Sequence, residues 1–146
     1  MAPSAVVNSN SGPVVLHHQV HTVIAEVKIT EGQWLLLAKV VFFNDDGDFQ
    51  DAAAQLLASP GNEPIQIDLS IASVPPAGGE GHAARFSSVS LLAWWQVDRE
   101  ETIQLVCWAY KGGAIRSSLV AVRANLLDPT TDQPTNNFPL PPGLPQ

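Results

Sequence analysis

The sequence predicts an all-β fold, an antiparallel β-sandwich or jelly roll with an extended N-terminal arm and a proline-rich C-terminal tail. Three observations support this prediction. Apolar and polar residues alternate with a period of two along several short runs, and clusters of Gly, Pro, Asn and Asp separate these runs. No long amphipathic helical pattern occurs. The runs recur every ~8–15 residues, a spacing typical of sandwiches and barrels.

Individual strands follow from this alternation. Residues 65–71 (IQIDLSI) show it most clearly, because their four apolar side chains share one face and the polar ones share the other. Residues 22–29 (TVIAEVKI) alternate in the same way. Residues 35–43 (LLLAKVVFF) are apolar on both faces, as expected of a central strand. Residues 52–58 (AAAQLLA) fit a helix by propensity and a strand equally well. The remaining strand candidates are residues 86–97, 102–110 and 114–127.

The chain is expected to divide into three parts, an N-terminal arm (1–13), a jelly-roll domain (14–127) and an extended tail (128–146). The arm is small and polar. The tail contains six prolines in nineteen residues, which excludes a central strand because proline cannot donate to the ladder. We expect both ends to lie along neighbouring subunits, since an extended proline-rich chain loses little further entropy on binding.

The composition excludes several classes of partner. Only 14% of the 146 residues are charged, the formal net charge is −7, and the seven Lys and Arg form no basic stripe. These features argue against nucleic acid and anionic membranes. The apolar run 35–43 is too short to span a bilayer and contains Lys39. One cysteine, Cys107, excludes an internal disulfide. No secretory signal is visible near the N-terminus, so we expect synthesis in the cytoplasm.

Residues 89–97 and 103–110 are predicted to pair as an antiparallel hairpin about Glu100, with apolar side chains on both of its faces. One face is the core. The other face carries the candidate contact residues Leu92, Trp94, Val106, Trp108 and Tyr110. A solvent-facing side is normally polar, so this face is predicted to be covered by another subunit or by a ligand. A loop, the arm or the tail of the same chain is the alternative cover.

Three of the four histidines, His17, His18 and His21, lie within five positions. Helical spacing would make them half of a zinc site. On a strand, however, His17 and His21 stand about 13 Å apart, whereas zinc holds its nitrogen ligands at about 2 Å. We therefore assign no intrachain metal and expect a polar or interface strand. A role at a three-fold axis stays open, and protonation below about pH 6.5 would weaken packing at a subunit contact.

Other candidates for chemistry give no catalytic, cofactor or metal site. Residues 44–51 (NDDGDFQD) lack the spacing of a calcium loop and are expected to form a solvated hairpin tip, with weak calcium binding as the alternative. Glu80 and His82 lie in a Gly-rich stretch expected to be an exposed loop, and no nucleophile motif accompanies them. Cys107 is expected to be a buried small apolar residue.

Several phrases of the sequence resemble the C1q/TNF-like jelly-roll family. EGQWLLLAKV, with Gly32 and Trp34, is similar to the family's core strand that opens with a glycine and an aromatic residue. Residues 88–108 resemble its pair of strands joined by a short acidic turn, and LVAVRANLL (119–127) resembles its closing strand. The family's Phe-Ser-Gly ending is absent. The resemblance implies a trimeric recognition head, spore-surface or virion component rather than an enzyme.

The sequence therefore predicts a non-enzymatic protein that works by assembling, as a homotrimer that decorates or stabilises a larger particle such as a virion capsid or tail. Its expected partners are copies of itself and other structural proteins of the particle, and its expected location is the particle surface. The alternative is a carbohydrate- or receptor-binding head domain, in which Trp94 or Trp108 stacks on sugar rings. No cofactor is expected.

Overall fold

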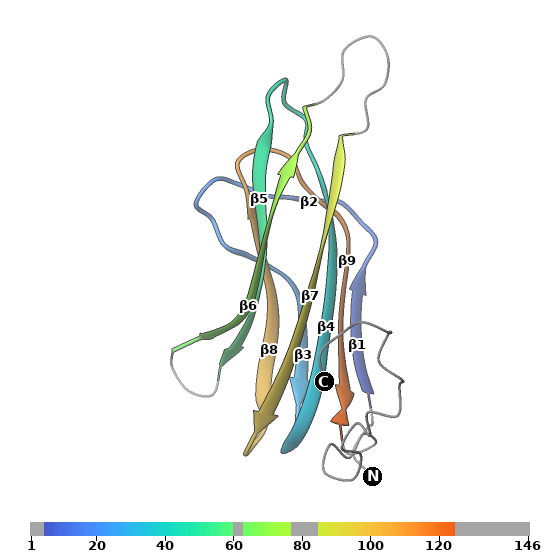
Figure 1. The fold of residues 1–146 in the computed structure, drawn as a ribbon, viewed down its shortest axis with the longest axis vertical. Coiled ribbons are helices and arrows are strands. Elements are labelled where there is room, and N and C mark those ends of the chain that lie inside the picture. The colour runs from blue at the N-terminus through green and yellow to red at the C-terminus, as the bar shows by residue number, and fades with distance from the viewer. Residues whose placement is uncertain (1–4, 60–62, 77–84, 125–146) are drawn as a thin grey trace, which may run out of the picture.

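The computed structural model describes residues 5–59, 63–76 and 85–124, which form two packed antiparallel sheets (Figure 1). The strands of this described part are β1 (Ala5–Asn10), β2 (Val14–Val15), β3 (Thr22–Ile29), β4 (Gly32–Phe43), β5 (Gln50–Ser59), β6 (Ile65–Val74), β7 (Phe86–Val97), β8 (Glu101–Ala109) and β9 (Gly113–Arg123). Sheet A has the order β1-β9-β4-β7, with β2 also paired to β9, and sheet B has the order β3-β8-β5-β6.

Most connections cross from one sheet to the other. In the described part, β5 and β6 are the only consecutive strands that pair with each other. From β6 to β9 every connection changes sheet, and so do the connections around β3 and β4. Two interleaved antiparallel sheets of this order form a jelly roll. The predicted fold class is thus confirmed.

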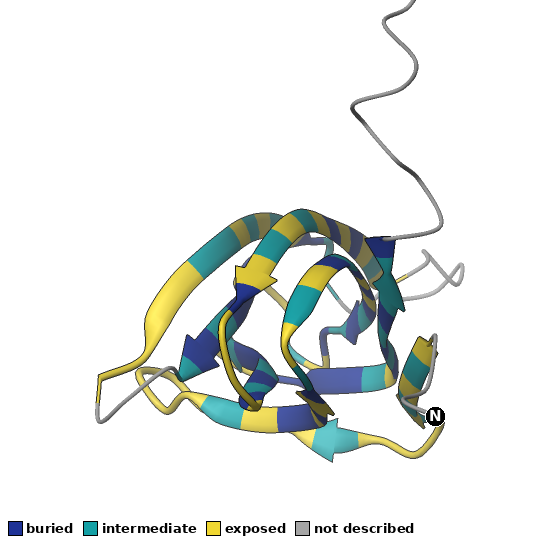
Figure 2. Ribbon diagram, turned by 90° about the horizontal axis from the view of Figure 1, so that it is seen from below, coloured by how far each residue is buried: buried dark blue, intermediate teal, exposed yellow. Residues whose placement is uncertain are grey.

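The core lies between the two sheets and takes alternate residues from each strand. β4 shows the pattern best, because Trp34, Leu36, Val40 and Phe42 are fully buried while the residues between them are more exposed. Figure 2 shows this alternation of buried and exposed residues along the strands. Residues 52–58, which fitted either a helix or a strand, lie in β5 and are mostly buried because β6 and β8 flank them.

The predicted hairpin of residues 89–97 and 103–110 is wrong. Strand β7 pairs with β4 in sheet A, and β8 pairs with β3 and β5 in sheet B. The turn around Glu100 therefore joins the two sheets. Both strands place apolar side chains on their inner face. Such side chains pack across the core from opposite sheets as well as they would lie side by side in one sheet, so the pattern does not distinguish the two arrangements.

The N-terminal part of the chain contributes a strand to sheet A. Within the expected arm (1–13), residues 5–10 form β1, an edge strand that pairs with β9 along its whole length. The expected tail (128–146) lies outside the described residues, as do Glu80 and His82. Among the described residues, no helix has the length and apolar character needed to cross a membrane.

Candidate functional site

The five predicted contact residues lie on two different faces of the sandwich. Leu92 and Trp94, on β7, point outward from sheet A and are 62% and 46% exposed. Trp108 and Tyr110 belong to the outer side of sheet B, where Tyr110 is 52% exposed. Val106 also faces this side but is only 3% exposed. The single covered face predicted from the sequence is therefore two separate surfaces.

On sheet A the strand register lines up outward-facing apolar residues in two neighbouring rows. We call these eight residues the sheet A apolar surface: Ala5, Val122, Leu35 and Trp94 in one row, and Val7, Val120, Leu37 and Leu92 in the next. The following row is polar and consists of Ser9, Ser118, Lys39 and Ser90. A hollow of about 370 Å³ lies over the boundary between apolar and polar rows, beside Leu37, Leu92 and Lys39. The apolar surface is thus continuous across four strands and bordered by polar residues.

The exposed edge of sheet A next to this surface is partly closed by sheet B. The backbone N–H of Leu92, on β7, donates to Oδ2 of Asp68, on β6, at 3.1 Å. In Figure 1, β6 and β7 run beside each other at the side of the sandwich. This contact occupies a donor that an added strand would need, so the face of sheet A is a better contact surface than its edge.

On sheet B, residues 16–21 cross the outer face and cover part of it. Leu16 anchors the segment, because its side chain is in the core and its N–H donates to the Gly112 carbonyl at 3.0 Å. His21 Nδ1 lies 3.1 Å from Nε2 of Gln55, which pairs with Val106 across the strands. Gln55 and Val106 are both buried, although both face outward. Val106 is therefore covered by its own chain, which was the alternative given for the predicted contact face, and not by another subunit or a ligand.

The histidine cluster lies on a turn, so the expectation that it forms a strand is wrong. The strand of this region is only Val14–Val15, and Gln19 has a positive φ of 60°, which breaks any extended run. The ring of His18 packs against Tyr110, with centroids 4.7 Å apart, and His17 is exposed. No group of three or more His, Cys, Asp and Glu is placed to hold a metal ion in the described ranges.

The acidic loop of residues 44–49 joins β4 to β5 and is organised by one buried side chain, Asn44. It connects the two sheets, so the predicted hairpin tip is wrong. The Asn44 amide nitrogen donates to the carbonyls of Asp48 and Pro75 at 2.7 and 3.0 Å. Its oxygen accepts from the N–H of Asp46 at 2.8 Å. Asn44 is fully buried, and these bonds hold the loop in one conformation.

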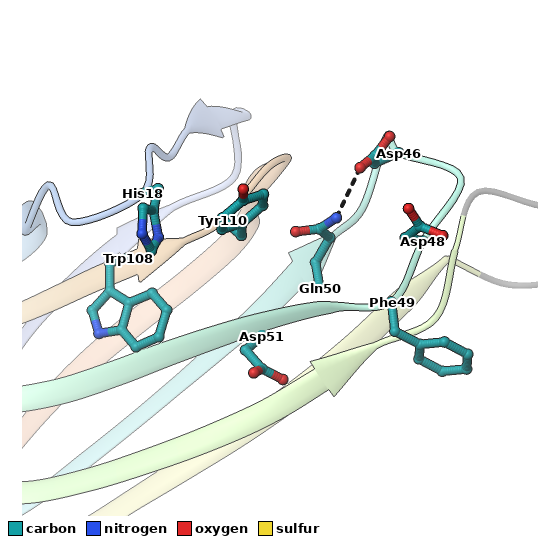
Figure 3. A pocket seen from close by; sticks show the side chains of 8 residues that line it. All are labelled: His18, Asp46, Asp48, Phe49, Gln50, Asp51, Trp108 and Tyr110. Carbon is teal, nitrogen blue, oxygen red and sulfur yellow. Dashed lines mark hydrogen bonds between the residues drawn. The ribbon is translucent and has the colours of Figure 1, made fainter.

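This loop forms one wall of a groove that sequence reasoning missed. The groove has a volume of about 380 Å³, with His18, Trp108 and Tyr110 on one side and the carboxylates of Asp46 and Asp48 on the other (Figure 3). The aromatic residues and the acidic loop were each identified in the sequence, but nothing there placed them side by side. Only the pairing of β5 with β8 brings the acidic loop beside the aromatic residues.

Cys107 lies in the core as expected, and its burial raises the pKa of the thiol to about 12. A thiol with so high a pKa is almost wholly protonated at neutral pH and is a poor nucleophile.

Comparison with known proteins identifies the fold and no family. No family model matches the chain, and no curated protein matches it. Among solved structures, Eiger TNF from S. frugiperda matches with a TM-score of 0.53 and 11% identity, over 89% of this chain and 99% of that chain. A chain of the T13 viral particle of infectious bursal disease virus matches with a TM-score of 0.51 and 11% identity, over 84% of this chain and 32% of that chain. The protein thus spans about a third of the viral chain, and at these identities the likeness is one of jelly-roll fold.

Proposed function

We propose that the protein is a non-enzymatic structural subunit that assembles with copies of itself through the sheet A apolar surface. The assembly is a homotrimer, and it decorates or stabilises a larger particle such as a virion capsid or tail. Its further partners are the other structural proteins of that particle, and it resides on the particle surface.

The sheet A apolar surface is the observation that carries this proposal. It presents two complete rows of apolar side chains on an outer face, where alternation normally places polar residues. Covering a fully exposed Leu or Trp side chain is worth about 2 kcal/mol, and Leu92 and Trp94 are each about half covered or less. Contiguous patches of this kind on soluble proteins mark interaction surfaces.

A second copy of the chain suits this surface because the eight residues carry no charge. Two copies with a net charge of −7 each repel one another over most of their surface, and the repulsion is weakest where an uncharged patch meets another. An apolar centre with a polar border is also the usual composition of a subunit interface. The trimer is proposed from the resemblance to C1q/TNF-like proteins, and the matches to a TNF and to a chain of a virus particle support the jelly-roll fold on which that resemblance rests.

Two substitutions on sheet A test the proposal. Leu92→Asp and Trp94→Ser are expected to convert the oligomer into a monomer in sedimentation velocity. Ile71→Asp is the matched control, because Ile71 is an equally exposed residue, at 61%, on the outer face of sheet B. Unchanged sedimentation of both sheet A variants, with circular dichroism like that of the parent chain, contradicts assembly through this surface.

The second candidate function is a carbohydrate- or receptor-binding head domain. The groove beside Trp108 is the specific observation that favours it, because Trp94 lies on the outer face of sheet A, where no carboxylate of the described residues lines the hollow beside it. Binding at the groove and assembly through sheet A use opposite faces, so both properties fit one molecule.

A further inference from the structure

The groove on the outer face of sheet B combines the partly exposed indole of Trp108 and the exposed ring of Tyr110 with carboxylates and an amide. We propose that it binds a saccharide, with one sugar ring stacked on Trp108 and its hydroxyl groups bonded to Asp51 and the acidic loop. The site is separate from the sheet A apolar surface, so it does not depend on assembly; it rests on the second candidate function and specifies its ligand class and contact residues.

The strand register produces the hollow. Trp108 on β8 lies opposite Ala53 on β5. Two residues further along, Tyr110 lies beside Asp51, whose carbonyl accepts from the Tyr110 N–H at 3.3 Å. The hollow lies between Trp108 and Tyr110 on one side and Gln50 and Asp51, at the start of β5, on the other. The resulting volume of about 380 Å³ lies at the small end of ligand sites and suits a single sugar ring.

The aromatic wall is fixed in place. His18 packs on Tyr110 with an interplanar angle of 58°, and the segment carrying His18 is anchored through Leu16. Trp108 also borders a second hollow of about 370 Å³ beside Gln19 and His21, so the indole is accessible from two sides. Its accessible face is negative and attracts the polarised C–H groups of a sugar, beside a Tyr110 ring that His18 holds in place.

The polar wall consists of three carboxylates and the Gln50 amide, and each of these planar groups carries two hydrogen-bonding atoms. Asp48 and Asp51 are exposed, and Gln50 Nε2 donates to Asp46 Oδ2 at 2.9 Å. The exposed carboxylates of Asp48 and Asp51 each have two oxygens that can accept from neighbouring hydroxyl groups, the arrangement that a sugar ring supplies. Because Asn44 already holds this loop, little ordering entropy is lost on binding.

The groove carries more negative than positive charge. Lys111 pairs with Asp46 at 3.3 Å and offsets that carboxylate, whereas Asp48 and Asp51 are exposed. A neutral polyol uses the exposed carboxylates as acceptors and the aromatic rings as a stacking surface. A basic peptide, which this charge also attracts, is the competing ligand and is included in the test.

The test begins with the full chain on an array of immobilised neutral and acidic glycans, followed by titration calorimetry with the best soluble glycan. We expect binding that Trp108→Ala and Asp51→Asn each weaken by about tenfold or more. Asp51 is exposed, so Asp51→Asn keeps the test valid if Trp108→Ala fails to fold. Arg116→Lys, at an exposed position of β9 outside both the groove and the sheet A apolar surface, is the control and is expected to leave the affinity unchanged.

Several results overturn the proposal. They are the absence of glycan binding at millimolar concentration, equal affinity of the parent chain and Asp51→Asn, and salt-sensitive binding of a hexa-arginine peptide where no glycan binds. The mass of each sample is measured by light scattering at the same time. Loss of assembly and loss of glycan binding are therefore observed independently.

Discussion

Among single residues, the most demanding positions are two adjacent glycines, Gly112 in the turn after β8 and Gly113 at the start of β9. A Cβ on Gly112, where φ is 91°, would overlap the carbonyl oxygen of Phe43, and one on Gly113 would overlap that of Val14. Backbone atoms cannot move aside as a flexible side chain can. We expect Gly112→Ala to lower the free energy of unfolding by about 3 kcal/mol or to prevent folding, as measured by urea denaturation. Gly47→Ala is the matched control and is expected to be nearly neutral, because open space surrounds that position. Equal midpoints for the two variants would show that the turn relaxes easily.

Cys107 gives the fold a dependence on alkaline pH. Burial raises the pKa of its thiol from 9.0 to about 12, so the folded chain keeps the proton over a range in which the unfolded chain releases it. The stabilisation is complete below pH 9 and declines as the pH rises from 9 toward 12. Between pH 8 and pH 10 the parent chain should lose about 1 kcal/mol of unfolding free energy that Cys107→Ala does not lose. Parallel pH profiles of the two chains in urea denaturation would contradict the burial of a protonated thiol.

At the scale of elements, the end of β9 is tied to the turn between β3 and β4. The guanidinium of Arg123 stacks 4.6 Å from the Trp34 ring and donates to the Glu31 carbonyl at 2.9 Å and to Oγ1 of Thr30 at 2.6 Å. Gly32 makes room for it, because a Cβ there would lie 2.8 Å from Arg123 Nη1.

Lysine keeps the charge of Arg123 but cannot reproduce its planar fork of donors. Arg123→Lys is therefore expected to lower the free energy of unfolding by about 1 kcal/mol. Arg116→Lys, at an exposed position of the same strand, is expected to have no measurable effect. Comparable shifts of the urea midpoint in both variants would indicate that the stacked, bidentate geometry contributes little.

The strands themselves were predictable from sequence, and their partners were not. Each of β3, β4, β6, β7 and β8 carries its own apolar alternation, which is a local property. Pairing is not local, because β4, β5, β7 and β8 all present an apolar inner face and any two of them fit one another by pattern alone. The choice of β4 as partner of β7 depends on which connections cross the sandwich. The prediction therefore paired β7 with β8 across what is in fact the core.

The same limit applies to the candidate sites. Leu92 and Trp94 were identified as an exposed apolar pair because they alternate outward along one strand. The rest of the sheet A apolar surface comes from β1, β4 and β9 and required the register. His18 was assigned to a strand because nothing in the local sequence indicates the positive φ at Gln19. The groove lies between this turn and the acidic loop, which the pairing of β5 with β8 brings together. No single segment of the sequence therefore indicates it.

At the scale of the whole molecule, the two outer faces have different character. Sheet A presents uncharged apolar rows, whereas sheet B carries the turn of residues 16–21, the acidic loop and the groove between them. A subunit that assembles through sheet A leaves sheet B facing outward. Under the proposed assembly, this division of faces leaves the groove accessible while the apolar surface is buried.

The native mass of the full chain tests the central claim most directly. Sedimentation velocity and native mass spectrometry at micromolar concentration should give a species with three times the mass of one chain. That species should persist at high salt, because uncharged surfaces hold it together. A stable, soluble monomer throughout the concentration range would contradict assembly through the sheet A apolar surface.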